Sequence, residues 1–185
     1  MRIALLCAGY LILVGCISGG GAHEPNQTLS QNISQDTTIR VETILDPAVM
    51  FVERNETIAL NSGRPLTTEE IQYAKKLGVQ NPERVRVEYR WNFPKPNDPT
   101  LSAELGELGF GSVFEGGRAT GYGIFVKPYM FDKDMIIRHE LVHVLQMERL
   151  GVAAFVKQYL EEAMTYEYHS MPLEREAFEA TADKR

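Results

Sequence analysis

Cysteine is scarce in this chain of 185 residues, which has two in all. Both of them, Cys7 and Cys16, lie near the N-terminus, and residues 17–185 contain none. That absence excludes internal disulfide bonds and thiolate metal ligands from everything beyond residue 16. Any zinc site in this part of the chain must therefore be built from histidine and carboxylate side chains.

Basic residues are also fewer than acidic residues. The sequence has 19 Lys and Arg against 25 Asp and Glu, a formal net charge of −6, and its basic residues are not clustered. A nucleic acid would find no positive surface to bind, so we exclude nucleic acid as a partner. The hydrophobic fraction of 44% and the charged fraction of 24% are those of an ordinary globular protein.

Long apolar runs are missing except at the N-terminus. There, one Arg is followed by residues 3–14, which are apolar almost throughout. This length is typical of a signal peptide and too short to span a bilayer comfortably. The run ends in Leu-Val-Gly-Cys16, which resembles the bacterial lipobox, where cleavage precedes a cysteine that is then lipidated. We predict a signal peptide over residues 1–15 and a lipid anchor on Cys16, which would attach an exported protein to a membrane of the cell envelope.

Two alternatives for the N-terminus stay open. Cleavage near residues 21–22 would discard Cys16 with a plain secretory signal, and an uncleaved segment would serve as a membrane anchor. Residues 16–40 are rich in Gly, Ser, Asn, Gln and Thr, a composition that cannot bury a core. We therefore predict a flexible tether over residues 16–40 and one folded domain over residues 41–185.

The rest of the sequence predicts an α+β domain with a small sheet and a helical C-terminal half. Alternating charged and apolar residues predict a strand over residues 84–91, and residues 121–127 predict a second strand. Residues 41–60 are ambiguous between helix and strand, and residues 92–100 predict a loop because they include three prolines. Apolar spacing, caps and stop residues predict further helices. These helices run from Thr67 or Thr68 to Gly78, from Asp132 or Asp134 to about Leu150, from Ala153 to about Tyr168 and from Pro172 to Ala182.

The motif His-Glu-Leu-Val-His occupies residues 139–143, inside the longest of these helices. At about 3.6 residues per turn, His139 and His143 project from one face, so their ring nitrogens can bind one zinc ion. Glu140 lies beside the first histidine, and its carboxylate can take a proton from a zinc-bound water and pass it to the leaving amine. We predict two zinc ligands and a general base. A chance match on a solvent-facing stripe is the alternative.

Residues 138–146, Arg-His-Glu-Leu-Val-His-Val-Leu-Gln, resemble the active-site helix of the gluzincin metallopeptidases, especially the small minigluzincin domains. Less specifically, the resemblance extends from Leu66 to Ala180. It implies a zincin-like fold in which an edge strand, here residues 121–127, lies above the active-site helix and binds an extended peptide. It also implies a third zinc ligand, a Glu in an E-x-x-A motif, and Glu174 begins such a motif.

Other residues compete for the third-ligand position. Glu176 lies two positions after Glu174, and side chains so placed on a helix point about 200° apart, so only one of them can face the metal. His169 is a further candidate ligand. More simply, it is an exposed residue or, with Tyr166 and Tyr168, a hydrogen-bond donor to the oxyanion of the reaction.

The chain also departs from the gluzincin pattern. Many gluzincins follow E-x-x-A with an Asp that orients the first histidine, and Phe178 occupies that position here. The first histidine would need another partner, such as Asp183 or a backbone carbonyl.

The sequence thus predicts a lipid-tethered zinc peptidase that hydrolyses peptides or proteins in the bacterial cell envelope. A zinc-binding envelope lipoprotein without turnover, acting as a binding or structural module, is the alternative. Glu140 favours the peptidase because binding zinc alone does not require that carboxylate, whereas the missing Asp favours the alternative. An envelope lipoprotein whose motif is incidental is the third hypothesis.

Overall fold

The structure is a computed structural model that describes residues 33–182. The predicted signal peptide, the lipidation site Cys16 and the possible partner Asp183 lie outside the described residues. Within them the chain is α+β, as predicted, with a small sheet and a majority of helix. No helix among residues 33–182 is both long enough and apolar enough to cross a membrane.

Helix α2 (Gln35–Ser62) answers the ambiguity over residues 41–60. The Ser34 side chain caps it by accepting a hydrogen bond from the Thr37 backbone N–H (3.0 Å). Its buried residues follow helical spacing and include Val41, Ile44, Ala48, Phe51 and Ala59. The predicted tether extends too far, because residues 35–40 belong to this capped, half-buried helix in spite of their polar composition.

The sheet has four short strands in the order β1-β2-β4-β3. They are β1 (Arg64–Pro65), β2 (Arg86–Tyr89), β3 (Gly117–Thr120) and β4 (Gly123–Val126). Strands β2 and β4 are parallel, whereas β1 pairs with β2 and β3 pairs with β4 in antiparallel fashion.

The predicted edge strand is therefore wrong. Residues 121–127 contribute β4, which pairs on both sides and is buried throughout, and the edge strand that contacts α5 is β3. Strand β3 reads Gly-Arg-Ala-Thr, which has no strand-like pattern of apolar residues. It forms because the chain reverses at Gly121, whose φ of 59° suits glycine, and places β3 antiparallel to β4.

Two shorter helices complete the N-terminal half of the described chain. Helix α3 (Thr68–Leu77) follows a capping box between Thr67 and Glu70 and ends at Gly78, in line with the prediction. Helix α4 (Pro99–Glu107) was not predicted. Three prolines favoured a loop there, yet the last of them takes the first helical position after the cap Asp98, where its missing N–H costs nothing.

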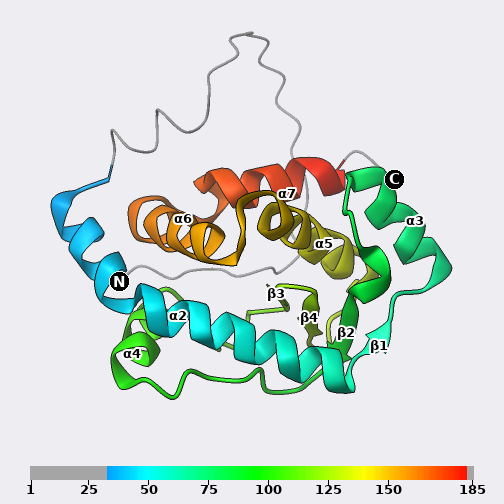
Figure 1. Ribbon diagram of the computed structural model, residues 1–185, viewed down its shortest axis with the longest axis horizontal. Helices are drawn as coiled ribbons and strands as arrows, with labels where there is room; N and C mark the ends of the chain where they lie inside the picture. The colour runs from blue at the N-terminus through cyan, green and yellow to red at the C-terminus, as the bar shows by residue number, and fades with distance from the viewer. Residues whose placement is uncertain (1–32, 183–185) are drawn as a thin grey trace, which may run out of the picture.

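The C-terminal half is helical. Helix α5 (Lys133–Leu150) is capped by Asp132 and ends at Gly151, and α6 (Val152–Thr165) follows directly. A short 3-10 turn, η2 (Tyr168–Ser170), leads into α7 (Pro172–Ala182). Figure 1 shows α7 along the top, α5 between it and the sheet, α6 beside α5, and α2 running below them.

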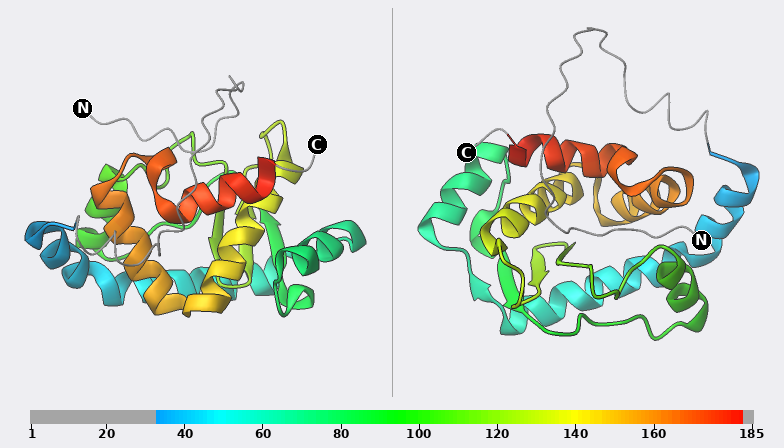
Figure 2. Two further views of the ribbon diagram at one scale, coloured as in Figure 1. Left: turned by 90° about the horizontal axis from the view of Figure 1, so that it is seen from above. Right: turned by 180° about the vertical axis from the view of Figure 1, so that it is seen from behind.

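Strand β4 shows why the sheet sits between helices. Ile124 and Val126 share a hydrophobic cluster with Ile136 of α5, whereas Phe125 clusters with Ala59 of α2. Neighbouring side chains of a strand point to opposite faces, so α5 covers one face and α2 the other. Beyond the sheet, α2 packs against α6, as the views in Figure 2 also show.

Candidate metal centre

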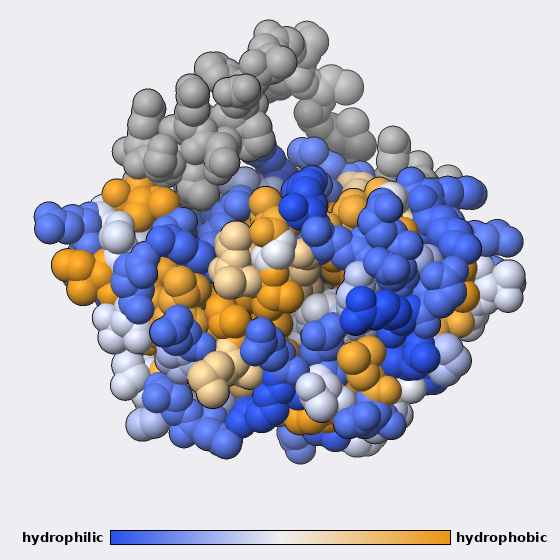
Figure 3. Space-filling model, viewed as in Figure 1, coloured by the Kyte–Doolittle hydropathy of each residue, from blue (hydrophilic) through white to orange (hydrophobic). Residues whose placement is uncertain are grey.

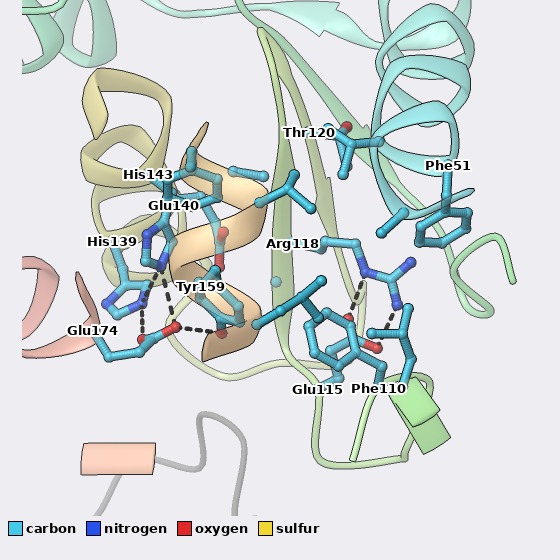
Figure 4. A pocket seen from close by; sticks show the side chains of 18 of the residues that line it. Phe51, Phe110, Glu115, Arg118, Thr120, His139, Glu140, His143, Tyr159 and Glu174 are labelled. Atoms are coloured by element: carbon cyan, nitrogen blue, oxygen red, sulfur yellow. Dashed lines mark hydrogen bonds and ion pairs between the residues drawn. The ribbon is translucent and has the colours of Figure 1, made fainter. Parts of the chain in front are cut away.

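Two histidines and one glutamate converge between α5 and α7. The Nε2 atoms of His139 and His143 lie 3.2 Å apart. The carboxylate oxygens of Glu174, in the first turn of α7, lie 3.1 Å from the Nε2 of His139 and 3.4 Å from that of His143. All three side chains are buried, and their donor atoms lie within 4.8 Å of one another, so this group could hold a metal ion (Figure 4).

The donor set fits a metal cation. The two Nε2 atoms and the Glu174 oxygens point at one another, so a single cation could receive a lone pair from each of the three side chains. Two histidines and one carboxylate are also the ligands of one type of catalytic zinc site, which keeps the fourth position open.

The charges of these three side chains also favour a cation at this position. Burial by itself would lower the pKa of His143, but the Glu174 carboxylate opposes burial and raises this pKa to about 9. Burial by itself would raise the pKa of Glu174, yet the two histidines hold it well below its usual range. A carboxylate that stays charged while it is buried favours positive charge beside it, whether from protons or from a metal.

Glu140 lies on the wall of the cavity that adjoins this group. Its side chain is buried, and burial raises its pKa against the opposing effect of the histidines. The edge strand passes directly over it, because a Cβ atom at Gly117 would lie 2.5 Å from its Oε1 and equally close to Ile136. A buried carboxylate with a raised pKa suits a group that takes up and returns a proton during a reaction.

The three candidates for the third metal ligand have different surroundings in the structure. Glu176 forms an ion pair with Arg149 (2.8 Å) and accepts a hydrogen bond from Gln146 (3.0 Å). His169 is exposed in η2 and stacks its ring against that of Phe178. Of the three candidates, only Glu174 is brought beside the two motif histidines.

Packing takes the place of the missing Asp at the first histidine. The ring of Phe178 lies against that of His139, with the centroids 4.9 Å apart. The second histidine has a hydrogen-bond partner, because the Nδ1 of His143 lies 2.8 Å from the Oε1 of Gln146.

Several residues of the site were not predicted from the sequence. Tyr159 of α6 donates a hydrogen bond to the Oε1 of Glu174 (2.7 Å). Gln146 lies three positions after His143 on the same helix face, a spacing that could have revealed it. Tyr159 and Gly117 carry no such signal, because only the tertiary structure brings them to α5.

A cavity of about 100 Å³ extends from this group toward α2. Most of its wall is apolar and consists of Ala48, Phe51, Val52, Leu105, Phe110, Phe155, Val156 and Leu160. Away from the metal centre, Arg118 and Glu115 form a buried, two-pronged ion pair of 2.6 and 2.8 Å, visible at the right of Figure 4.

A second, larger cavity of about 380 Å³ shares the side chains of Phe110, Tyr159 and Tyr168 with the first. Of the residues suggested as oxyanion donors, Tyr168 lines both cavities, and Tyr166 lines the second. On the face shown in Figure 3, hydrophobic side chains gather between the level of α6 and that of α2.

Comparison with known proteins gives no family assignment, since no protein-family model, curated protein or solved structure matches the chain. A function must therefore be argued from the residues of the site.

Proposed function

We propose that this protein is a zinc-dependent peptidase. The observation that carries the proposal is the convergence of His139, His143 and Glu174 beside a cavity whose wall includes Glu140. We further infer a zincin-type fold, since an edge strand crosses the helix that bears the motif.

Each residue then has a chemical role. Zinc held by the two histidines and Glu174 would act as a Lewis acid that activates water and polarises the peptide carbonyl. Glu140 accepts the proton of the attacking water and delivers it to the leaving amine. Tyr168, on the cavity wall, is our candidate donor to the negative charge that develops on the carbonyl oxygen.

The surroundings indicate the form of the substrate. The outer edge of β3 offers backbone groups to which an extended peptide can add as a further strand. The adjoining cavity suits an apolar side chain, since most of its wall is apolar, and its volume of about 100 Å³ is below the roughly 150 Å³ of an apolar cavity that binds benzene. Arg118 and Glu115 in its wall are already paired with each other, so a charged side chain would lose its hydration there for little gain, and we expect apolar residues next to the cleaved bond.

We also propose, from the sequence, that the protein acts in the bacterial cell envelope through a lipid anchor on Cys16. Replacement by Ser should prevent lipid labelling and processing. Unchanged labelling would contradict this assignment.

The test of the peptidase measures zinc content and cleavage of a peptide library by the purified protein. Glu140→Gln should keep the metal and lose about 10²–10⁴-fold in cleavage rate, because an amide cannot accept the proton. Glu179→Gln is the matched control and should keep both zinc and activity, since Glu179 is exposed on the same helix as Glu174 and pairs with Arg175 (3.7 Å) away from the centre.

Two results would contradict the proposal. Purified protein without zinc would exclude the metal site. Zinc bound tightly without cleavage of any peptide would favour the zinc-binding module, the alternative supported by Phe178 at the place of the orienting Asp.

A further inference from the structure

The proposed metal ligands come from two helices that are distant in sequence, so their geometry depends on what holds α7 against α5. Leu173, the residue before Glu174, has both of its backbone polar groups bonded to side chains of other helices. Its N–H donates to Glu162 of α6 (2.8 Å), and its carbonyl accepts from Gln146 of α5 (2.9 Å). Both of these side chains are completely buried.

Gln146 also contacts a proposed ligand directly. Its Oε1 accepts from the Nδ1 of His143, and its Nε2 donates to Glu176 as well as to Leu173. The orientation of the amide follows from these contacts, since a reversed amide would turn its oxygen toward two acceptors. Because Oε1 can only accept, His143 keeps a proton on Nδ1, and when the ring is neutral, as a metal ligand must be, the lone pair lies on Nε2.

Glu162 secures the start of α7. Its Oε2 accepts from the Leu173 N–H and its Oε1 from the Gln158 side chain (2.8 Å). The first N–H groups of a helix have no partner within the helix, and a negative charge is favoured at that end. The carboxylate therefore fixes the first turn of α7, the turn that carries Glu174.

We propose that Gln146 and Glu162 are positioning residues of the metal centre. Together they clamp the backbone of Leu173 between α5 and α6, so that His143 and Glu174 present their donor atoms at one point. The inference rests on the proposed function only in that the centre binds zinc. It goes beyond the peptidase reaction, because the clamp acts on the ligands and not on the substrate.

A clamp can be told apart from ordinary core packing. If the two residues only stabilise the fold, their loss lowers the free energy of unfolding but leaves the metal affinity of the folded protein unchanged. If they position the ligands, zinc affinity falls in protein that is still folded. Removal of groups that orient metal ligands typically costs about 10–100-fold in metal affinity.

The experiment uses the purified full chain and measures the zinc Kd by competition with a chromophoric chelator. The visible absorption spectrum of the Co²⁺-loaded protein reports ligand geometry independently of activity. Gln146→Met and Glu162→Met keep the approximate side-chain length but remove the hydrogen bonds. We expect each to weaken zinc binding about 10–100-fold and to change the cobalt spectrum.

Two variants serve as controls. Glu162→Gln can still accept from the Leu173 N–H through its amide oxygen and should bind zinc with nearly wild-type affinity. Val85→Ala removes two buried methyl groups from the hydrophobic cluster beside the sheet. It should lower stability without changing the zinc Kd. If Gln146→Met does not fold, Gln146→Glu takes its place, since it accepts from His143 but cannot donate to Leu173.

Unchanged zinc affinity and an unchanged cobalt spectrum in both Met variants would overturn the clamp and leave the proposed function intact. Wild-type protein that binds no zinc would overturn both. Zinc binding that weakens in the Met variants of a protein that cleaves no peptide would support the clamp and count against the peptidase alone.

Discussion

Glu174 and Glu176 stand two positions apart on α7, and their environments differ completely. Glu174 is buried against two histidines, whereas Glu176 forms an exposed ion pair with Arg149. Both contact α5, but helix geometry by itself requires that only one of them point at the two histidines. Which one does so depends on how α7 is rotated, and that rotation follows from the burial of Leu173 and Ala177 on the same face.

The charge of this residue group predicts a pH dependence for the metal-free protein. The pKa of His143 is about 9 in the folded state, above the ordinary value of 6.5. The protonated histidine therefore stabilises the fold fully below about pH 6.5, and this contribution is lost as pH rises through 9. At roughly 1.4 kcal/mol per pKa unit, it amounts to about 3 kcal/mol.

The measurement is urea unfolding of metal-free protein between pH 6 and pH 10, with His143→Gln as the comparison. The wild-type protein should lose stability across this range, and the variant should lose markedly less. Equal pH dependence in the two proteins would contradict the assigned coupling between His143 and Glu174.

At the scale of elements, the contact between β3 and α5 decides the shape of the site. Gly117 of β3 lies so close to Glu140 and Ile136 that no Cβ fits at its position. Gly117→Ala should push the strand or the carboxylate aside, lowering the free energy of unfolding by about 1–3 kcal/mol and reducing peptide cleavage. Circular dichroism with chemical denaturation, followed by the peptide assay, measures both effects.

Gly106→Ala is the matched control for this substitution. Gly106 lies in α4 with open space around its Cα, so an added methyl group meets nothing. In a helix, this change should raise stability by up to about 1 kcal/mol and leave cleavage unchanged. Two variants that behaved alike would show that β3 does not press on Glu140.

At the scale of the whole molecule, the apolar cavity exists because residues of α2, α4 and α6 line the space beside the candidate metal centre. Ala48 of α2 is a small residue on its wall. Ala48→Leu should fill part of the cavity and shift the substrate preference from large to small apolar side chains. Each CH₂ group excluded from burial should reduce the preference for a large substrate by about fourfold in kcat/KM.

The assay compares kcat/KM for peptides that carry Ala, Leu or Phe next to the cleaved bond. Ala48→Gly is the control and should leave the preference for Leu and Phe intact. If Ala48→Leu lowered the rates for all peptides equally, the cavity would not be the site of this side chain.

The sequence by itself determined the features that depend on local spacing. The helical repeat places His139, Glu140 and His143 together whatever the rest of the chain does. The cap at Asp132 and the stop at Gly151 bound that helix for reasons that are also local. For the same reason, α3 and α7 were predictable nearly to the residue.

Only the tertiary structure decided the features that depend on distant contacts. Strand β3 has no strand-like pattern and becomes the edge strand because β4 is buried and pairs on its other side with β2. Gln146, Tyr159 and Glu162 acquire their roles through hydrogen bonds to α7, which begins beyond all three in the chain. Such bonds form once the apolar faces of the helices have packed, so no local sequence pattern predicts them.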